Sequence, residues 1–185
     1  IRPTKKLGQN FVIDPNTIRR IVAAAELSND DLVVEIGPGL GSLTLGILEI
    51  VPKVIAVEID ERLAQELPST VSKHAPDKEL ALVLADALKV KELPGQPTAL
   101  VANLPYNIST PILFHLLDHV ALVQDQHFML QKEVVDRMAA APGSKDYGRL
   151  SVMLQWRYRI ENVLDVPPEA FDPPPRVDSA VVRME

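Results

Sequence analysis

Cysteine is absent from the 185 residues, which excludes disulfide bonds and thiolate metal sites and fits a reducing compartment such as the cytoplasm. Aromatic residues are scarce, at 4% of the chain. No apolar run approaches the roughly 20 residues that a membrane-spanning helix needs, and the charged first residues lack the apolar core of a secretory signal. The composition that remains, 46% hydrophobic and 24% charged, is typical of one globular domain.

The formal net charge is −6, but the charges are unevenly distributed along the chain. Residues 1–20 are basic, and a second basic stretch covers residues 132–159. Because salt screens repulsion beyond about 10 Å, an acidic protein with such patches can still bind a polyanion locally. Ordinary solvated surface charge is the alternative explanation for both stretches.

Apolar segments of strand length alternate with segments of helical periodicity. We expect strands at residues 32–36, 53–59, 80–85, 98–102 and 126–130, with helices at residues 42–51, 61–72, 110–119, 133–140 and 147–156. Pro68 is expected to break the second of these helices, and residues 159–166 and 177–184 to form a terminal strand pair. The alternation predicts an α/β, doubly wound, mostly parallel sheet with one antiparallel strand and helices on both faces. Ligands of such sheets bind beyond the carboxyl ends of the strands.

A glycine-rich turn follows the first of these strands. Gly37, Gly39 and Gly41 come directly after Glu35-Ile36, and such glycines let a backbone approach a ligand closely. A dinucleotide fingerprint would need glycine at position 42, which is Ser42. The spacing instead resembles motif I of the class I S-adenosylmethionine-dependent methyltransferases, and a tight turn without a ligand is the alternative.

Two acids end the next two strands. Glu58 follows residues 54–57, and its carboxylate could accept hydrogen bonds from both hydroxyls of a ribose. Stabilisation of the following helix is the alternative role, but Asp60 suits that role better. Asp86 follows residues 80–85 and could accept a hydrogen bond from the exocyclic amine of an adenine, although a strand-end Asp is unremarkable by itself.

The segment Asn103-Leu104-Pro105-Tyr106 ends the strand at residues 98–102. It resembles motif IV of methyltransferases that act on amino groups of adenine or on planar amides. The Asn103 side-chain oxygen and the Leu104 carbonyl can each accept one N–H of such an amine, Pro105 fixes the turn, and Tyr106 can stack on a base. A turn with a structural tyrosine is the alternative.

Six blocks in the same order resemble the ribosomal RNA adenine dimethyltransferases, the KsgA type more than the erythromycin-resistance methylases. They are residues 5–11 (KKLGQNF), the glycine turn, and residues 103–111 (NLPYNISTP), 128–134 (FMLQKEV), 147–152 (YGRLSV) and 171–179 (FDPPPRVDS). The resemblance implies a Rossmann-like class I fold, S-adenosylmethionine as cofactor, and dimethylation of the N6 amine of adenines in small-subunit ribosomal RNA. The implied partner is an immature small ribosomal subunit, and the implied state is a monomer.

The resemblance also implies roles for individual residues. Phe171, flanked by prolines, would stack on the flipped target base, with an anchoring role in its loop as the alternative. The residues implied to hold the cofactor are Gln9, Asn10, Val12 through its backbone, Gly37, Gly39, Glu58, Ile59, Asp86, Ala87 and Asn103. The residues implied to contact RNA phosphates are Lys5, Lys6, Lys145 and Arg149.

Two features are not expected to carry chemistry. His115 and His119 have the i, i+4 spacing of a metal site, but Leu116 stands where the catalytic Glu would follow and no third ligand is evident, so no metal is expected. Trp156 is expected to pack in the core or on the sheet.

Two other functions remain open. A methyltransferase acting on a protein glutamine amide uses a similar turn, but Leu104 differs from its proline. A non-catalytic RNA-binding assembly or transcription factor of the same fold is the other. Family members continue into a small C-terminal helical domain, which we expect to be absent here because the chain stops at Glu185; its loss would impair RNA affinity.

Overall fold

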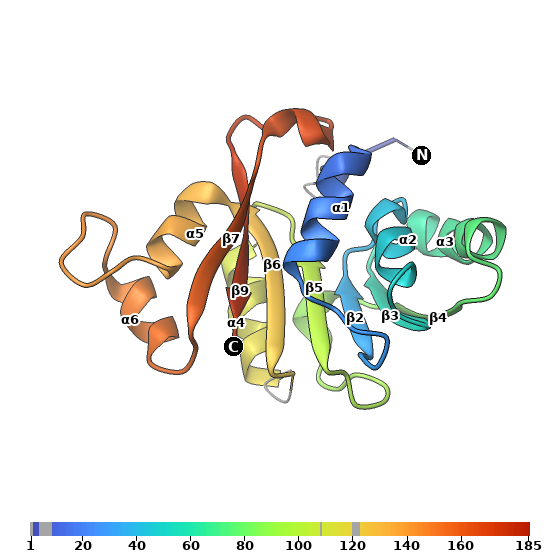
Figure 1. Ribbon diagram of the computed structural model, residues 1–185, viewed down its shortest axis with the longest axis horizontal. Helices are drawn as coiled ribbons and strands as arrows, with labels where there is room; N and C mark the ends of the chain where they lie inside the picture. The colour runs from blue at the N-terminus through green and yellow to red at the C-terminus, as the bar shows by residue number, and fades with distance from the viewer. Residues whose placement is uncertain (1, 4–8, 108, 120–122) are drawn as a thin grey trace.

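A computed structural model describes residues 2–3, 9–107, 109–119 and 123–185 (Figure 1). Lys5 and Lys6, which were expected to contact RNA, lie outside these residues. The elements in chain order are β1 (Phe11–Val12), α1 (Pro15–Ala24), β2 (Val33–Ile36), α2 (Ser42–Leu48), β3 (Lys53–Glu58), α3 (Glu61–His74), β4 (Glu79–Leu84), the 3-10 helix η2 (Ala87–Lys89), β5 (Ala99–Asn103), α4 (Ser109–His119), β6 (Asp125–Gln131), α5 (Lys132–Met138), α6 (Arg149–Gln155), β7 (Ile160–Val166), the 3-10 helix η3 (Pro168–Ala170), β8 (Phe171–Asp172) and β9 (Ser179–Met184).

The main sheet has seven strands in the order β4-β3-β2-β5-β6-β9-β7. The first five are mutually parallel, and β9 is antiparallel to both of its neighbours. The predicted fold class is therefore confirmed, including the single antiparallel strand. A small second sheet, which was not predicted, pairs β1 with β8 in antiparallel register, Val12 opposite Phe171.

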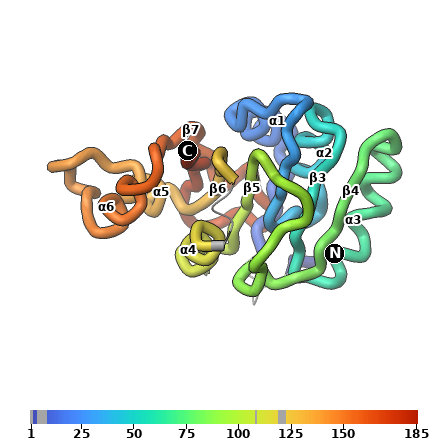
Figure 2. The backbone as a smooth tube through the Cα atoms, turned by 90° about the horizontal axis from the view of Figure 1, so that it is seen from below, coloured from blue at the N-terminus to red at the C-terminus, as the bar shows by residue number. Residues whose placement is uncertain are grey.

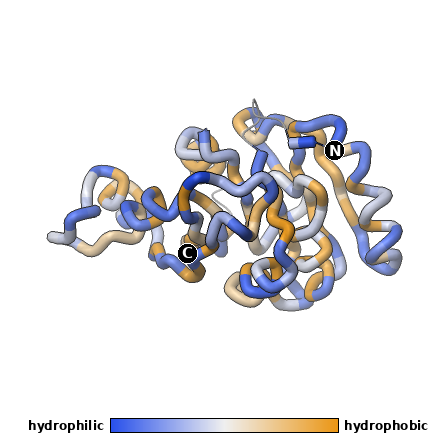
Figure 3. Tube along the Cα trace, turned by 90° about the horizontal axis from the view of Figure 1, so that it is seen from above, coloured by the Kyte–Doolittle hydropathy of each residue, from blue (hydrophilic) through white to orange (hydrophobic). Residues whose placement is uncertain are grey.

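The two faces of the sheet are covered by different helices, as the view from below shows (Figure 2). Alternate residues of each strand point to opposite faces: Val34 and Ile36 pack toward α4, α5 and η2, while Val33 packs toward α1, α2 and α3. In Figure 3, hydrophilic stretches ring the outside and hydrophobic colour is concentrated on the central strands. This burial on both faces explains why the strands have near-continuous apolar sequences.

Two predictions about local structure are wrong. Pro68 does not break its helix: α3 runs from Glu61 to His74 with Pro68 on its exposed side, because packing of Leu67 and Val71 on the opposite side holds the helix together. Trp156 does not pack in the core: 87% of its surface is exposed. No helix in the described ranges is long and apolar enough to span a membrane.

Candidate active site

A cleft lies beyond the carboxyl ends of the parallel strands β2 to β5. The empty space between its walls, counted out to its open mouth, is about 900 Å³. Nearly all of the residues predicted for the cofactor and the amine line it, namely Gln9, Asn10, Gly37, Gly39, Glu58, Ile59, Asp86, Ala87, Asn103, Leu104, Pro105 and Tyr106. The register explains this convergence, because parallel strands in one sheet end at the same edge.

Gly37 brings the ends of β2 and β5 into contact. Its φ is +74°, and a Cβ at this position would lie 2.8 Å from the backbone oxygen of Asn103, closer than real contacts allow. Its N–H donates a hydrogen bond to the Val57 carbonyl at 2.9 Å, which ties the turn to β3 as well. The absence of a side chain at residue 37 therefore sets the spacing between the glycine turn and Asn103.

Glu58 is buried at the end of β3, with 6% of its surface exposed. One carboxylate oxygen accepts the Gly39 N–H at 3.1 Å, and the other accepts the Asp60 N–H at 3.0 Å. Burial raises the pKa of Glu58, while these two hydrogen bonds oppose the rise. A carboxylate has about four lone-pair sites, so each oxygen keeps the capacity to accept one more hydrogen bond from a ligand in the cleft.

Asp60 takes the helix-capping role that the sequence assigned to it. Its side chain accepts the Arg62 N–H at 3.0 Å at the start of α3, and hydrogen bonding from the Arg62 side chain is the main reason that the pKa of Asp60 falls to about 2. Asp60 also accepts a hydrogen bond from Gln9 Nε2 at 2.9 Å. This contact holds Gln9 at the mouth of the cleft.

The amide of Asn103 has a defined orientation. Its Nδ2 donates to the Asn10 carbonyl at 3.3 Å, so Oδ1 is the atom that remains to accept a hydrogen bond from a ligand. Asp86 also lines the cleft, and one of its oxygens already accepts the Leu88 N–H at 2.9 Å as the cap of η2. The cleft thus presents an amide oxygen and two carboxylates at its polar edge.

The ring of Tyr106 is held in place by a hydrogen bond to a residue of strand β9. Its hydroxyl is hydrogen-bonded to the hydroxyl of Ser179, the fully buried first residue of β9, and burial raises the pKa of Tyr106. Sequence reasoning missed Ser179 as a supporting residue, although it is the last residue of the FDPPPRVDS block. Phe11 was missed too. Its ring packs against Gly39, where a Cβ would lie only 2.9 Å from Phe11 Cδ1.

Glu35 is the most unusual group that sequence reasoning left without a role. It is 1% exposed beneath the glycine turn, where one oxygen is hydrogen-bonded to the Thr44 hydroxyl and the other has no partner among the described residues. Burial, with a smaller contribution from Glu58, raises the pKa of Glu35 to about 8. The acid before the first glycine was the available signal for it.

Four predicted site residues lie outside this cleft. Val12 lines a smaller cavity on the other side of the glycine turn. Phe171 is 2% exposed and packs in the core, which favours the anchoring alternative; its stacking role stays a prediction. Lys145 is exposed in the segment before α6, and Arg149 is exposed at the first residue of α6. In the part of the chain that the structure describes, no group of three or more His, Asp or Glu residues could hold a metal ion.

The strand order and the cleft define a class I, Rossmann-like methyltransferase domain. The family model for ribosomal RNA adenine dimethylase matches residues 2–185, and the chain belongs to this family.

Relatives with known names agree with this assignment. The chain is 57% identical to the ribosomal RNA small subunit methyltransferase A of Leptothrix cholodnii, over 98% of this chain and 67% of that protein. It is 54% identical to the protein of the same name from an Arthrobacter species, over 98% of this chain and 62% of that protein.

Solved structures are similar over the same region. A dimethyladenosine transferase from Plasmodium falciparum matches with a TM-score of 0.84 and 33% identity, over 94% of this chain and 62% of that one. The 23S rRNA methyltransferase ErmE matches with a TM-score of 0.82 and 35% identity, over 95% and 69%. The chain therefore spans about two thirds of the length of the relatives that it matches.

Proposed function

We propose that residues 1–185 form the catalytic domain of a KsgA-type S-adenosylmethionine-dependent dimethyltransferase. Its reaction transfers methyl groups to the exocyclic N6 of adenines in small-subunit ribosomal RNA, giving N6,N6-dimethyladenosine. The substrate is an immature small ribosomal subunit, which the protein meets as a monomer in the cytoplasm. The observation that carries this proposal is that Asn103 and Tyr106 share one cleft with Glu58, Asp86 and the glycine turn.

The cleft fits S-adenosylmethionine. Gly37 and Gly39 leave the backbone bare where the methionine part would lie, and a side chain at either position would meet neighbouring atoms at 2.8 or 2.9 Å. Glu58 would accept hydrogen bonds from the ribose hydroxyls with its remaining lone pairs. Asp86 would accept a hydrogen bond from the adenine amine, and the Ala87 backbone would lie beside the adenine. Gln9 and Asn10 would close the site. When bound, this cofactor supplies an electrophilic methyl group on a sulfonium sulfur.

The residues of the Asn103 corner act on the target amine. The exocyclic nitrogen of adenine is a poor nucleophile, because its lone pair is delocalised into the ring. Asn103 Oδ1 and the Leu104 carbonyl each accept one N–H, which favours a pyramidal nitrogen whose lone pair is free to attack. Donation from Asn103 Nδ2 to the Asn10 carbonyl fixes which end of the amide faces the amine. Preorganised acceptors of this kind are a major source of rate enhancement.

Tyr106 would stack on the target base, and stacking of this kind contributes about 1–3 kcal/mol per base. The bond between Tyr106 and Ser179 keeps the ring in place before the base arrives. A nitrogen that has gained a methyl group is acidic, so its proton passes to water and no side-chain base is required.

The test is a methyl-transfer assay on under-methylated small ribosomal subunits with isotope-labelled cofactor, followed by mass analysis of the digested nucleosides. We expect label in dimethyladenosine from the wild-type protein. Label in added protein release factors and none in RNA would favour the glutamine-amide alternative. Saturable RNA binding without any transfer would favour the non-catalytic assembly factor.

A further inference from the structure

Helix α6 presents an apolar stripe to solvent. Val152, Met153 and Trp156 are 51%, 46% and 87% exposed, and with Arg149 they have the i, i+3, i+4, i+7 spacing of one helix face. The opposite face buries Ser151 and Leu154. The stripe is therefore the side of α6 that the described residues leave uncovered.

The helix that carries the stripe is firmly attached. Gln155 Nε2 donates to the Met138 and Ala140 carbonyls at 2.9 Å each, and the Ser151 hydroxyl donates to the Arg137 carbonyl. These bonds join α6 to the end of α5, and the pair projects from one side of the molecule (Figure 2). Trp156 is thus displayed on a fixed support, which lowers the entropy lost when a ligand stacks on it.

The segment of the chain that carries the stripe is basic, although Arg157 also lines a groove with Asp125 and Glu185. Residues 137–157 contain Arg137, Lys145, Arg149 and Arg157 against Asp146 alone, in a chain whose net charge is −6. In the described ranges none of these four cations forms an ion pair with a carboxylate, whereas the flanking Lys132 pairs with Asp136 at 2.9 Å. Arg157 instead lies over the Tyr158 ring, 5.6 Å from its centroid. The segment is complementary to a polyanion.

The stripe borders a groove that reaches the first turn of α4. Arg149 and Met153 line a groove together with Thr110 and Phe114 of α4. Thr110 follows Tyr106, a cleft residue, by four positions. Because α4 contributes Ile112 to the cleft and Thr110 to the groove, a nucleic-acid strand bound at Tyr106 could reach α6 along α4.

We propose that Trp156 stacks on an unpaired base of the RNA substrate and that Arg149 and Arg157 contact its phosphates. The inference rests on the proposed function, since it takes RNA as the substrate. An exposed aromatic ring flanked by unpaired cations is the combination by which proteins hold single-stranded RNA. A single-stranded RNA would use both the apolar stripe and the cations, whereas an apolar protein partner would use the stripe alone.

Trp156 is the only tryptophan in the chain, so its emission reports directly on this site. The experiment titrates the wild-type protein with a short single-stranded oligoadenylate and, separately, with a duplex RNA of equal length. We expect the single strand to quench the emission in step with binding followed by anisotropy of labelled RNA, and the duplex to quench it weakly. Unchanged emission at saturating single-stranded RNA would overturn the inference.

Variants separate stacking from apolar contact. Trp156→Phe keeps an aromatic ring and is expected to keep most of the RNA affinity, whereas Trp156→Leu keeps only apolar volume and is expected to lose about tenfold. Equal affinities of the two variants would refute stacking and point to a protein-docking surface. Circular dichroism and melting temperature check that both variants fold.

A charge pair of variants tests the phosphate contacts. Arg157→Gln is expected to weaken RNA binding. It should also reduce the slope of log affinity against log salt concentration by about one, because one fewer counterion is released. The matched control is Lys73→Gln, because Lys73 is an exposed cation on α3, at the opposite end of the molecule (Figure 1). This variant should leave the RNA affinity and its salt dependence unchanged. Equal effects of the two variants would refute a specific contact.

A methyl-transfer assay distinguishes failure of the Trp156 inference alone from failure of the proposed function. If the wild-type protein methylates RNA but Trp156 emission does not respond to it, only the stacking site is refuted. If the wild-type protein binds no RNA, both the proposed function and the inference are refuted.

Discussion

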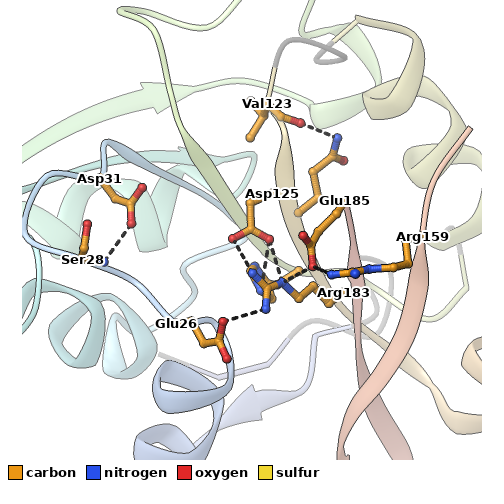
Figure 4. Close-up of polar contacts among 10 residues, drawn as sticks. Glu26, Ser28, Asp31, Val123, Asp125, Arg159, Arg183 and Glu185 are labelled. Atoms are coloured by element: carbon orange, nitrogen blue, oxygen red, sulfur yellow. Dashed lines mark hydrogen bonds and ion pairs between the residues drawn. The ribbon is translucent and has the colours of Figure 1, made fainter.

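The two ends of the main sheet use charged side chains in opposite ways. At the cleft end, Glu35 and Glu58 are buried, neither pairs with a cation in the described part of the chain, and burial raises the pKa of both. At the other end, Arg183 of β9 forms ion pairs with Asp125, Glu26 and Glu185 at 3.0, 2.9 and 3.2 Å (Figure 4).

The far-end cluster is satisfied within the protein. Arg159 joins it through Glu185 at 2.8 Å, and this hydrogen bond is the main reason that the pKa of Glu185 is lowered. In the described part of the chain, Glu35 and Glu58 of the cleft face no cation, whereas the acids of the far end are paired with arginines. Acceptors are thus left available where a ligand is expected, and charges are neutralised where the sheet only needs to stay together.

The largest effect is expected from Asn103→Ala, which removes the amide oxygen from the cleft. We expect methyl transfer to fall by about a hundredfold or more, because preorganised polar groups at a reacting centre contribute that much. Single-turnover assays with saturating cofactor measure this, and an unchanged melting temperature shows that the fold is intact. Near-normal turnover would remove the amine-polarising role of Asn103.

The next largest effect is expected from Glu58→Ala. Loss of a charged acceptor weakens cofactor binding by about a hundredfold, and Glu58→Gln, which keeps one acceptor oxygen, loses less. Isothermal titration calorimetry measures both. The control is Glu61→Gln, an exposed acid in the first turn of α3. Unchanged affinity in Glu58→Ala would reassign this carboxylate to structural support of the turn.

A smaller effect, on stability instead of binding, is expected at the far end. Asp125→Asn removes a charge from Arg183, whose side chain is 18% exposed, and should lower the free energy of unfolding by about 1–2 kcal/mol. Cofactor affinity should not change. Glu79→Gln, whose partner Lys53 lies 3.9 Å away on the surface, is the control and should have little effect. A loss of cofactor affinity in Asp125→Asn would contradict the separation of the two ends.

The last expected effect is a change in the pH dependence of stability, with no change in binding. The pKa of Glu35 is about 8 when folded and 4.5 in its ordinary range, so between these values the folded protein holds a proton that the unfolded chain has released. Stability from this group is fully present below pH 4.5 and falls as pH rises, by at most about 1.4 kcal/mol per pH unit. Glu35→Gln removes this slope.

Chemical denaturation of both proteins between pH 5 and 8 measures the difference. Burial lowers the pKa of His127, which gives a slope of opposite sign in both proteins, so only the comparison isolates Glu35. Parallel pH profiles would show that Glu35 is ionised in the fold.

The sequence was sufficient for the features that depend on local pattern and on sheet geometry. Once the strands were recognised, the convergence of Gly37, Glu58, Asp86 and Asn103 followed from parallel strand ends sharing one edge. The capping role of Asp60 followed from its place before α3.

Features that depend on distant contacts were not predictable. The bond between Tyr106 and Ser179 joins residues 73 positions apart, and the pairing of β1 with β8, which buries Phe171, spans an even longer separation. The predictions for Pro68 and Trp156 were wrong for a related reason. Neither type of residue indicates by itself which side of its helix will face the sheet, and that side decided both outcomes.

The position of β9 has a consequence for synthesis of the protein. This strand is the last one in the described part of the chain, yet it lies between β6 and β7 and supplies Ser179 to Tyr106. A growing chain can therefore assemble β2 to β5 early, but it cannot join β7 to the sheet or fasten the tyrosine until β9 has left the ribosomal tunnel. The half of the pocket that would hold the nucleobase is therefore completed after the half that would hold the methyl donor.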